Sequence, residues 1–265
     1  MNKTDPQSSL ERYGFGHDRG SAHMARTMML DELRLLLKAV PAVPGLSDDY
    51  SRAIEMENCL GKRSHRTRTL TRRHLTNLYA LNPEQALFRA LRYLWQRDAE
   101  GQPLLAGLCA YARDPFMRVT APLILGLSEG HAFAHESIEK LLDTRYPGRF
   151  SKATLRSTSR NLASTWTQTG HLVGCVKKSR SRTRATDGST AYALLLGFLT
   201  GERGELLFRT EYTRLLDCPF ETALDLAETA SRKGWIVLKR VGNVIEVLFP
   251  SILTQQEMGW VHEQS

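Results

Sequence analysis

The stretch SKATLRSTSRNLASTWTQTGHLVGCVKKSRSRTRAT, Ser151 to Thr186, decides the fold that we expect for this 265-residue chain. Ser151 is a suitable N-cap for a helix, and Gly170 is a suitable C′ glycine for its end. The segment His171 to Ala185 lacks helical periodicity, and another helix, His135 to Tyr146, is expected before the stretch. The order of helix, short turn, helix and extended basic segment predicts a helix-turn-helix with a wing.

The second of these helices is predicted to carry a row of cations. Its buried side takes the apolar residues Leu155, Leu162, Ala163 and Trp166. Lys152, Arg156 and Arg160 follow one another at i, i+4, and Ser164 and Gln168 continue that row. Aligned cations repel each other by a few tenths of a kcal/mol per pair on an isolated helix. No acid within the segment relieves this repulsion, whereas a phosphate backbone would.

The extended segment adds more cations. Arg180, Arg182 and Arg184 alternate with Ser181 and Thr183, so in a strand the three arginines are expected to point to one side. Small hydroxyl side chains between them also suit phosphate contact. The alternative interpretation is a flexible, solvated surface loop.

Positive charge is concentrated in two segments of the chain. Thr144 to Thr186 holds ten Lys or Arg residues and no acid, and Asn58 to Pro83 holds six and again no acid. The rest of the chain is net acidic, although the whole carries a charge of +8. Such separation is what a phosphate-binding surface requires, because counterion release scales with the cations that reach the backbone together.

The earlier cluster is less directional than the later one. It consists of Lys62, Arg63, Arg66, Arg68, Arg72 and Arg73. The last four do not share one helical face. Three interpretations stay open, namely partly solvated helix charges, a second contact with the same nucleic acid, and an interface with an acidic partner.

The remaining sequence predicts a mainly α fold in four ranges. Residues 1–20 are expected to form a flexible arm, 21–130 a multi-helix bundle, 131–200 a basic winged-helix-like domain, and 201–265 a second, acidic winged-helix-like unit. The helices expected in the bundle are Ala22–Val40, Ser47–Leu60, Ser64–Leu81, one starting at Asn82-Pro83-Glu84, Pro103–Arg113 and Pro115–Leu127, with Asp114 as a cap.

The tail repeats the helix–helix–hairpin order without matching residues. Helices are expected over Glu205–Leu216 and Pro219–Lys233, followed by a hairpin of Trp235–Val241 and Val244–Phe249 around Gly242-Asn243. The second helix holds Glu221, Asp225 and Glu228, which would repel phosphate. This unit is therefore expected to pack on the protein or to meet another protein.

Signals for catalysis, metal, cofactor and membrane are weak. The chain has no phosphate-binding loop, dinucleotide-binding fingerprint or nucleophile elbow. His131 and His135 stand at i, i+4, but no third ligand is apparent. The four separated cysteines, Cys59, Cys109, Cys175 and Cys218, are expected to be reduced core residues. The polar amino terminus and an apolar run of only Ala191 to Leu199 predict a soluble cytoplasmic protein without cofactors.

Several stretches resemble the BrxA family, accessory proteins of bacterial BREX phage-defence systems. They are ENCLGKRSHRTRTLTRRHL (Glu57 to Leu75), the acidic Glu32 in the preceding helix, PLLAGL (Pro103 to Leu108) and STSRNLASTWTQTGHL (Ser157 to Leu172). The resemblance covers roughly Gly20 to Gly201. It implies a helical bundle similar to the NusB antitermination fold joined to a winged-helix-like part, double-stranded DNA binding, no catalytic activity, and work beside a methyltransferase and ATPases.

We therefore expect a non-enzymatic DNA-binding component of a phage-defence system. Lys152, Arg156 and Arg160 would lie along a groove, and Asn161 and Gln168 could touch base edges. The residues expected to clamp phosphates are Lys177, Lys178, Arg180, Arg182 and Arg184. The alternatives are a protein-interaction scaffold that docks acidic partners, and an RNA-binding protein similar to antitermination factors.

Overall fold

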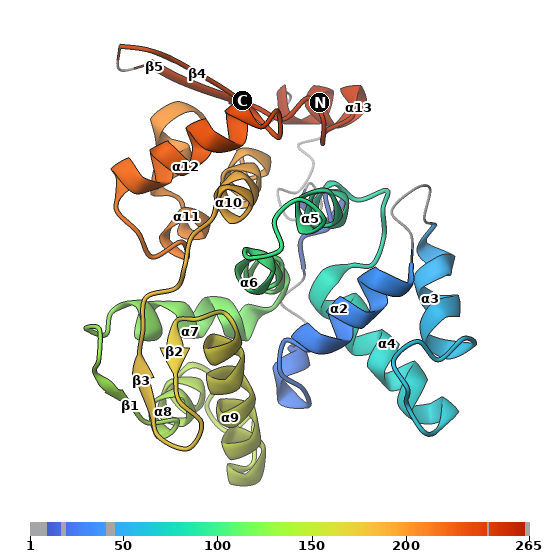
Figure 1. The fold of residues 1–265 in the computed structure, drawn as a ribbon. Helices are drawn as coiled ribbons and strands as arrows, with labels where there is room; N and C mark the ends of the chain where they lie inside the picture. The colour runs from blue at the N-terminus through green and yellow to red at the C-terminus, as the bar shows by residue number, and fades with distance from the viewer. Residues whose placement is uncertain (1–9, 17–19, 41–45, 243, 263–265) are drawn as a thin grey trace, which may run out of the picture. The chain divides into compact units, whose positions relative to one another are not determined.

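The computed structural model describes residues 10–16, 20–40, 46–242 and 244–262, and it is mainly helical with two small antiparallel sheets (Figure 1). The chain divides into two compact units, each assembled from separate stretches of sequence. Unit 1 comprises Met1–Phe15, Asn82–Leu108 and Arg184–Ser265, and unit 2 comprises Gly16–Leu81 and Cys109–Thr183. The mainly helical class is confirmed, while the four predicted ranges do not coincide with these units.

Unit 2 begins with four helical segments, which are η1 (Ala22–Met24), α2 (Leu30–Ala39), α3 (Ser47–Glu55) and α4 (His65–Tyr79). The single helix predicted over Ala22–Val40 is wrong, because the chain is not helical between Met24 and Leu30, and Met29, the N-cap of α2, has φ +55°. Tertiary hydrogen bonds replace the helical ones there. The N–H of buried Met28 donates to Thr165 Oγ1 over 2.9 Å, and its carbonyl accepts from the Tyr79 hydroxyl.

The joint between α6 (Gln102–Arg113) and α7 (Pro115–Leu125) is a single residue, Asp114. Helix α6 runs from unit 1 into unit 2, and α7 belongs to unit 2. Asp114 caps α7 as predicted, since its Oδ1 accepts the N–H groups of Phe116 at 2.9 Å and Met117 at 3.4 Å. Proline at the next position needs no hydrogen bond of its own, which favours a helix start here.

The second part of unit 2 follows the order α7, β1 (Ala132–Phe133), α8 (Glu136–Arg145), α9 (Lys152–Gln168), β2 (Leu172–Val173) and β3 (Lys178–Arg180). The strands form an antiparallel sheet in the order β1-β3-β2. The register pairs Leu172 with Arg180 and Ala132 with Ser179. The two helices and the extended segment predicted here are confirmed, although the extended segment forms only a short hairpin.

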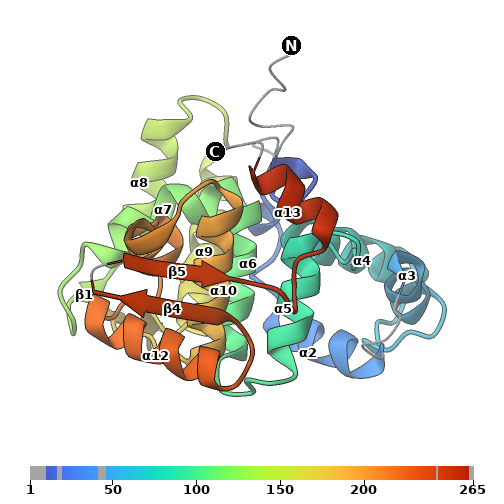
Figure 2. The same cartoon turned by 90° about the horizontal axis from the view of Figure 1, so that it is seen from above.

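Unit 1 is built around α10 (Asp187–Leu199), which is buried from Gly188 to Leu199. Its other elements are α5 (Ala86–Trp95), η2 (Gly204–Arg209), α11 (Glu211–Arg214), α12 (Phe220–Arg232), β4 (Val237–Val241), β5 (Val244–Leu248) and α13 (Gln255–His262). The hairpin β4–β5 lies over α10 and α12 (Figure 2). The predicted second helix and hairpin of the tail are confirmed, with Asn243 outside the described residues. The helix predicted over Glu205–Leu216 is divided into η2 and α11.

The predicted flexible arm is wrong for its described part. Tyr13 is fully buried, and its carbonyl accepts the N–H of Leu87 over 3.0 Å. Its ring meets Trp260 edge-on with 6.0 Å between centroids. An aromatic side chain of this size contributes substantial apolar burial, which holds the segment on unit 1. Residues 1–9 and 17–19 of the predicted arm lie outside the described residues.

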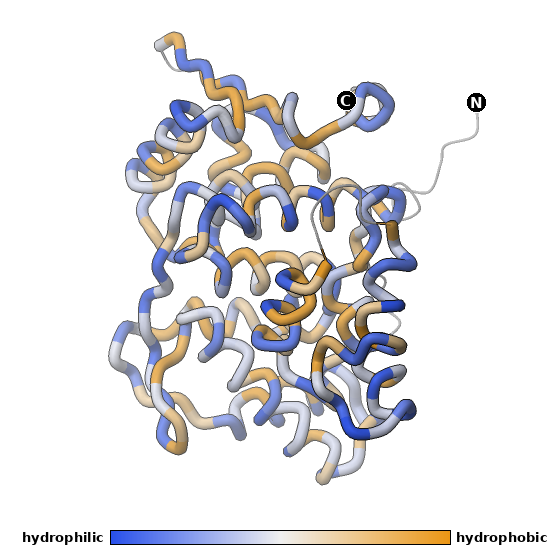
Figure 3. Tube along the Cα trace, turned by 45° about the vertical axis from the view of Figure 1, so that its right-hand side comes forward, coloured by the Kyte–Doolittle hydropathy of each residue, from blue (hydrophilic) through white to orange (hydrophobic). Residues whose placement is uncertain are grey.

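Apolar residues alternate with polar ones along many of the helices (Figure 3). The run Ala191 to Leu199 is part of the buried helix α10, and no helix in the described ranges is long and apolar enough to cross a membrane. The cysteine prediction holds in part. All four are free thiols, and Cys109 is buried, but Cys175 is exposed on the turn between β2 and β3.

Candidate nucleic-acid interface

Helix α9 is fixed at both ends by the residues that its sequence suggests. The Ser151 hydroxyl accepts the N–H of Thr154 over 3.1 Å, as an N-cap should. At the other end Gly170 has φ +87°, and a Cβ there would lie 3.0 Å from Thr183 Oγ1. Only glycine fits this left-handed position without strain. The chain therefore turns sharply from α9 into β2.

The exposed side of α9 carries the predicted row of cations. Lys152, Arg156 and Arg160 are all exposed. Within the described ranges, no carboxylate lies at ion-pair distance from any of the three. On the opposite side of α9, the residues Leu155, Leu162, Ala163 and Trp166 are buried, as predicted. The row thus presents three charges that the protein itself does not neutralise.

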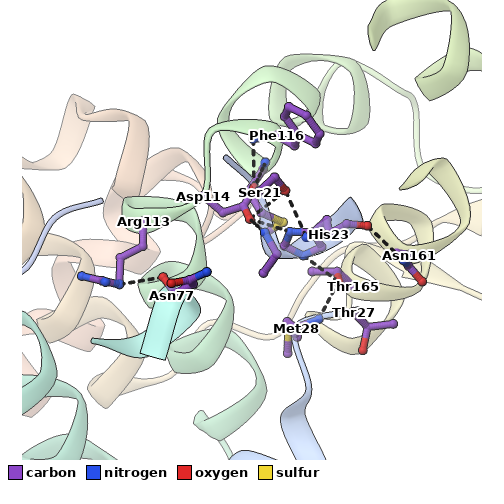
Figure 4. A network of polar contacts seen from close by, with 12 residues as sticks. Ser21, His23, Thr27, Met28, Asn77, Arg113, Asp114, Phe116, Asn161 and Thr165 are labelled. Atoms are coloured by element: carbon purple, nitrogen blue, oxygen red, sulfur yellow. Dashed lines mark hydrogen bonds and ion pairs between the residues drawn. The ribbon is translucent and has the colours of Figure 1, made fainter. Parts of the chain in front are cut away.

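A buried polar network anchors α9 to η1 and to the start of α7 (Figure 4). His23 is fully buried, with Nδ1 3.0 Å from Asp114 Oδ2 and Nε2 3.0 Å from Thr165 Oγ1. Asp114 also accepts from the Ser21 hydroxyl at 2.8 Å and from the N–H of Ala22 at 2.9 Å. Burial alone would raise the pKa of Asp114, but His23, Ser21 and the N–H of Phe116 outweigh it and hold that pKa below its usual value.

This network changes the role of Asn161. Its side-chain amide donates to the carbonyl of His23 over 2.9 Å, and the residue is half-buried against η1. In this structure the Asn161 side chain serves the packing of α9, and its contact with base edges stays a prediction. Gln168, the other predicted base-reading residue, is also half-buried, and its Oε1 is enclosed.

The hairpin brings one lysine beside the helix. Lys178 Nζ donates to Thr167 Oγ1 at 2.8 Å and to the carbonyl of Gly174 at 3.0 Å. Its partial burial lowers the pKa of Lys178, and the nearby Cys175 thiol opposes this shift. Lys177 is exposed next to it. Lys178 therefore lies against the C-terminal end of α9, beyond the last cation of the row.

The three arginines of the hairpin do not share one side, so that prediction is wrong. Arg180 is only 4% exposed and donates to the carbonyls of His171 and Ser181. It ends β3, the central strand, where its N–H donates to the carbonyl of His131 and its carbonyl accepts the N–H of Gly130. Arg182 is exposed and lies 3.3 Å from Glu129. Arg184 is exposed, forms an ion pair with Glu100 and belongs to unit 1.

Two members of the earlier basic cluster are neutralised by ion pairs inside unit 2. Lys62 lies 3.0 Å from Glu32, and Arg72 lies 2.7 Å from Glu55, which lowers the pKa of that carboxyl group. Arg68 is half-buried. The exposed members without a carboxylate partner among the described residues are Arg63, Arg66 and Arg73. The cluster thus splits into structural and solvent-facing charges.

Sequence patterns gave no signal for the buried network. Asp114 was identifiable as a cap, but nothing in the spacing of Ser21, His23 and Thr165 connects them to it. A second missed feature is Arg149, whose guanidinium lies 5.3 Å from the ring centres of both Tyr146 and Phe150. This basic residue therefore packs on aromatic rings beside the start of α9.

Metal ligation finds little support in this region. His135 lies near the carboxylates of Glu136 and Glu139, at 3.4 and 3.6 Å, and His131 is exposed. No group of three metal-ligating side chains is found in the part of the chain that the structure describes.

Comparison with known proteins gives no match to any family model and no significantly similar curated protein.

Proposed function

We propose that this chain is a non-enzymatic double-stranded DNA-binding component of a bacterial phage-defence (BREX) system, acting in the cytoplasm. The order α7, β1, α8, α9, β2, β3, with β3 between β1 and β2, agrees with a helix-turn-helix that carries a wing. In such a unit the second helix of the pair enters the major groove. Helix α9 occupies that place, and the hairpin β2–β3 occupies the place of the wing.

The observation that carries the proposal is the unpaired row Lys152, Arg156 and Arg160. Eight residues of α-helix span about 12 Å. This length corresponds to roughly three to four nucleotide steps along one strand of B-DNA. The major groove, about 12 Å wide, also admits an α-helix. The row therefore matches the spacing and the width that a duplex offers.

Duplex DNA suits this surface better than single-stranded RNA. Single strands are usually held by aromatic side chains on which bases stack. The aromatic residues nearest the start of α9, Tyr146 and Phe150, instead pack with each other and with Phe116. Competition between duplex DNA and RNA of the same sequence tests this preference directly.

The proposal is tested by gel-shift titration at several salt concentrations. With about five phosphates neutralised, log K should fall against log salt with a slope of roughly −4 to −5. The triple variant K152A/R156A/R160A should reduce this slope by about 2.7, at 0.9 per contact. The matched control removes three exposed cations of unit 2 that belong to neither basic segment, as R34A/K38A/K140A. A slope near zero, or equal losses in the two variants, contradicts the proposal.

A protein-interaction scaffold is the second candidate, and one observation favours it. Val241 and Val244, on either side of the β4–β5 turn, are 80% and 70% exposed, and α12 presents acidic Glu221 and Asp225. Exposed apolar side chains beside charged ones suit protein partners. Partners of the kind that the BrxA resemblance implies are a methyltransferase and ATPases. Pull-downs from nuclease-treated extract separate the candidates, because a scaffold keeps its partners without nucleic acid.

A further inference from the structure

A pocket of about 410 Å³ opens in unit 2 between η1, α4 and the joint of α6 with α7. Its walls include Met24, Arg73, His74, Asn77 and Arg113. The pocket is separate from the row on α9, because none of the residues of that row contributes to its walls. Its volume lies in the range of small-molecule sites in proteins.

Two arginines are among the described wall residues of this pocket. Arg73 is exposed at its wall, with no carboxylate at ion-pair distance in the described ranges. Arg113 is held in place by α4, since its Nε donates to the carbonyl of Asn77 at 2.9 Å and its guanidinium to that of Thr76 at 3.1 Å (Figure 4). The pocket therefore has one fixed and one adjustable guanidinium.

The carboxylate in the wall does not offset these charges toward a ligand. Asp114 is only 3% exposed, and its oxygens accept from Ser21, Ala22 and Phe116 and face the ring of His23. Its lone pairs are thus turned to the interior of unit 2. An anion that enters the pocket therefore meets the exposed Arg73 rather than this carboxylate.

His74 supplies a further polar group. Its Nδ1 is buried and has no hydrogen-bond partner among the residues that the structure describes. Leaving such an atom unpaired is costly, so a rotation of the half-buried ring that brings Nδ1 to a ligand in the pocket would be favoured. Burial lowers the pKa of His74, and Arg26 and Arg73 lower it further. The positive charges of Arg26 and Arg73 thus disfavour protonation of His74, and the same charges would attract an anion to the His74 ring.

The walls favour a compact anion over a nucleoside. Met24 is the one large apolar side chain among the wall residues of the described chain, and it is itself 38% exposed. No Phe, Tyr or Trp among the described residues lines the pocket, so the half-buried His74 ring is the one aromatic surface that these residues offer to a base. Guanidinium groups bind phosphate oxygens through paired N–H donors. The chemistry therefore matches the phosphate group itself.

We propose that this pocket binds a phosphate group with two or more negative charges, with Arg73 and His74 as its adjustable ligands. The proposal is independent of DNA binding by α9. The ligand is either a free oxyanion, for which inorganic pyrophosphate is the probe, or the terminal 5′ phosphate of a nucleic acid.

Calorimetric titration of the full chain with pyrophosphate tests the proposal. R73A should weaken binding at least tenfold, while R66A, which removes an exposed cation of the same helix outside the pocket, should change it less than twofold. NMR titration of the His74 ring should show its pKa rising when pyrophosphate is bound. Arg113 is left intact, since its loss would uncap α4. No saturable binding at low millimolar pyrophosphate, or equal effects of R73A and R66A, overturns the site.

A competition experiment distinguishes the two sources. Short oligonucleotides with a 5′ phosphate or a 5′ hydroxyl are compared for displacement of pyrophosphate. Displacement by the phosphorylated form alone assigns the pocket to nucleic-acid ends, and displacement by neither assigns it to a free anion. Equal displacement by both forms overturns the proposal, because the pocket would then respond to backbone charge in general.

Discussion

Two segments of this molecule share the order helix, helix, hairpin, and they differ in charge. In unit 2 the segment is α8, α9 and β2–β3, and in unit 1 it is α11, α12 and β4–β5. The exposed side of α9 is basic over its first two turns, whereas α12 exposes Glu221 and Asp225. The same succession of elements therefore presents opposite charges. The order of elements supplies the scaffold, and the exposed residues decide which partner it suits.

The buried sides of the two helices differ as well. Helix α12 packs through the small and apolar residues Ala223, Leu224, Ala227 and Ala230. Helix α9 buries Trp166 together with Thr158, Ser159 and Thr165. The Trp166 indole N–H donates to Thr120 Oγ1 over 3.0 Å. Hydrogen bonds are directional, so these polar contacts hold α9 in one orientation. Removal of any one hydrogen-bond partner should therefore weaken the packing of α9.

Giving α9 the charge of α12 should have the largest effect on duplex binding. The double variant R156E/R160E should lower duplex affinity by about 100-fold or more at 0.1 M salt. Each lost phosphate contact lowers log K by about 0.9 at 0.1 M salt relative to 1 M salt, and the new acids also repel the DNA backbone. Fluorescence anisotropy with labelled duplex measures this. The matched control E221K/D225K reverses two charges on α12 and should leave duplex binding at least as strong as in the parent. A loss below threefold in R156E/R160E would mean that α9 does not face the duplex.

The polar anchor of α9 predicts the next largest effect. Asp114→Ala removes the buried charge beside His23 and leaves the N–H groups of Ala22 and Phe116 without an acceptor. Breaking a buried pair on one side costs about 3–5 kcal/mol. Hydrogen exchange should show lost protection in α9, with α12 as the internal control because it lies in the other unit. Equal loss in both helices would contradict a local anchor.

The same carboxylate makes unit 2 sensitive to acid. The pKa of Asp114 is lower in the folded chain than in the unfolded chain, where it is about 3.9. The stabilisation is therefore fully present above about pH 5, and it declines as pH falls through the unfolded and then the folded pKa. Below about pH 4, the backbone amides of α9 should lose protection from hydrogen exchange before those of α12. Asp114→Asn should remove this difference in pH dependence between the two helices. Loss of protection in both helices at the same pH argues against this assignment.

Local signals in the sequence predicted the elements well, and tertiary contacts account for the failures. Caps such as Ser151 and Asp114, and the left-handed Gly170, act within a few residues, so the helix ends they predict are confirmed. The break at Met29 depends on hydrogen bonds of its neighbour Met28 with Thr165 and Tyr79, far away in sequence. No periodicity contains that information.

The candidate site shows the same division. The row on α9 follows from helical spacing alone, and its exposure agrees with that spacing. Two further side chains make contacts that spacing does not reveal, because Arg180 donates to the carbonyls of His171 and Ser181, and Asn161 donates to the carbonyl of His23. Charge patterns identify where cations gather, but pairing with Glu32, Glu55 or Glu129 can be seen only in three dimensions.

The smallest predicted effect concerns Arg182, an exposed cation of the hairpin region that a carboxylate of the protein partly neutralises. It lies 3.3 Å from Glu129, and both side chains are more than 60% exposed. Such a pair is worth about 0.2–1 kcal/mol, and a duplex would have to compete with it. Glu129→Gln should therefore raise duplex affinity by roughly 1.5- to fivefold, and the gain should shrink at high salt because the competing attraction is screened. Glu221→Gln removes an exposed acid from α12 with the same change in net charge, so it separates a local effect from a general one. If the two variants gain equally, Arg182 takes no part in the interface, and the cations near α9 then reduce to its own row with Lys177 and Lys178.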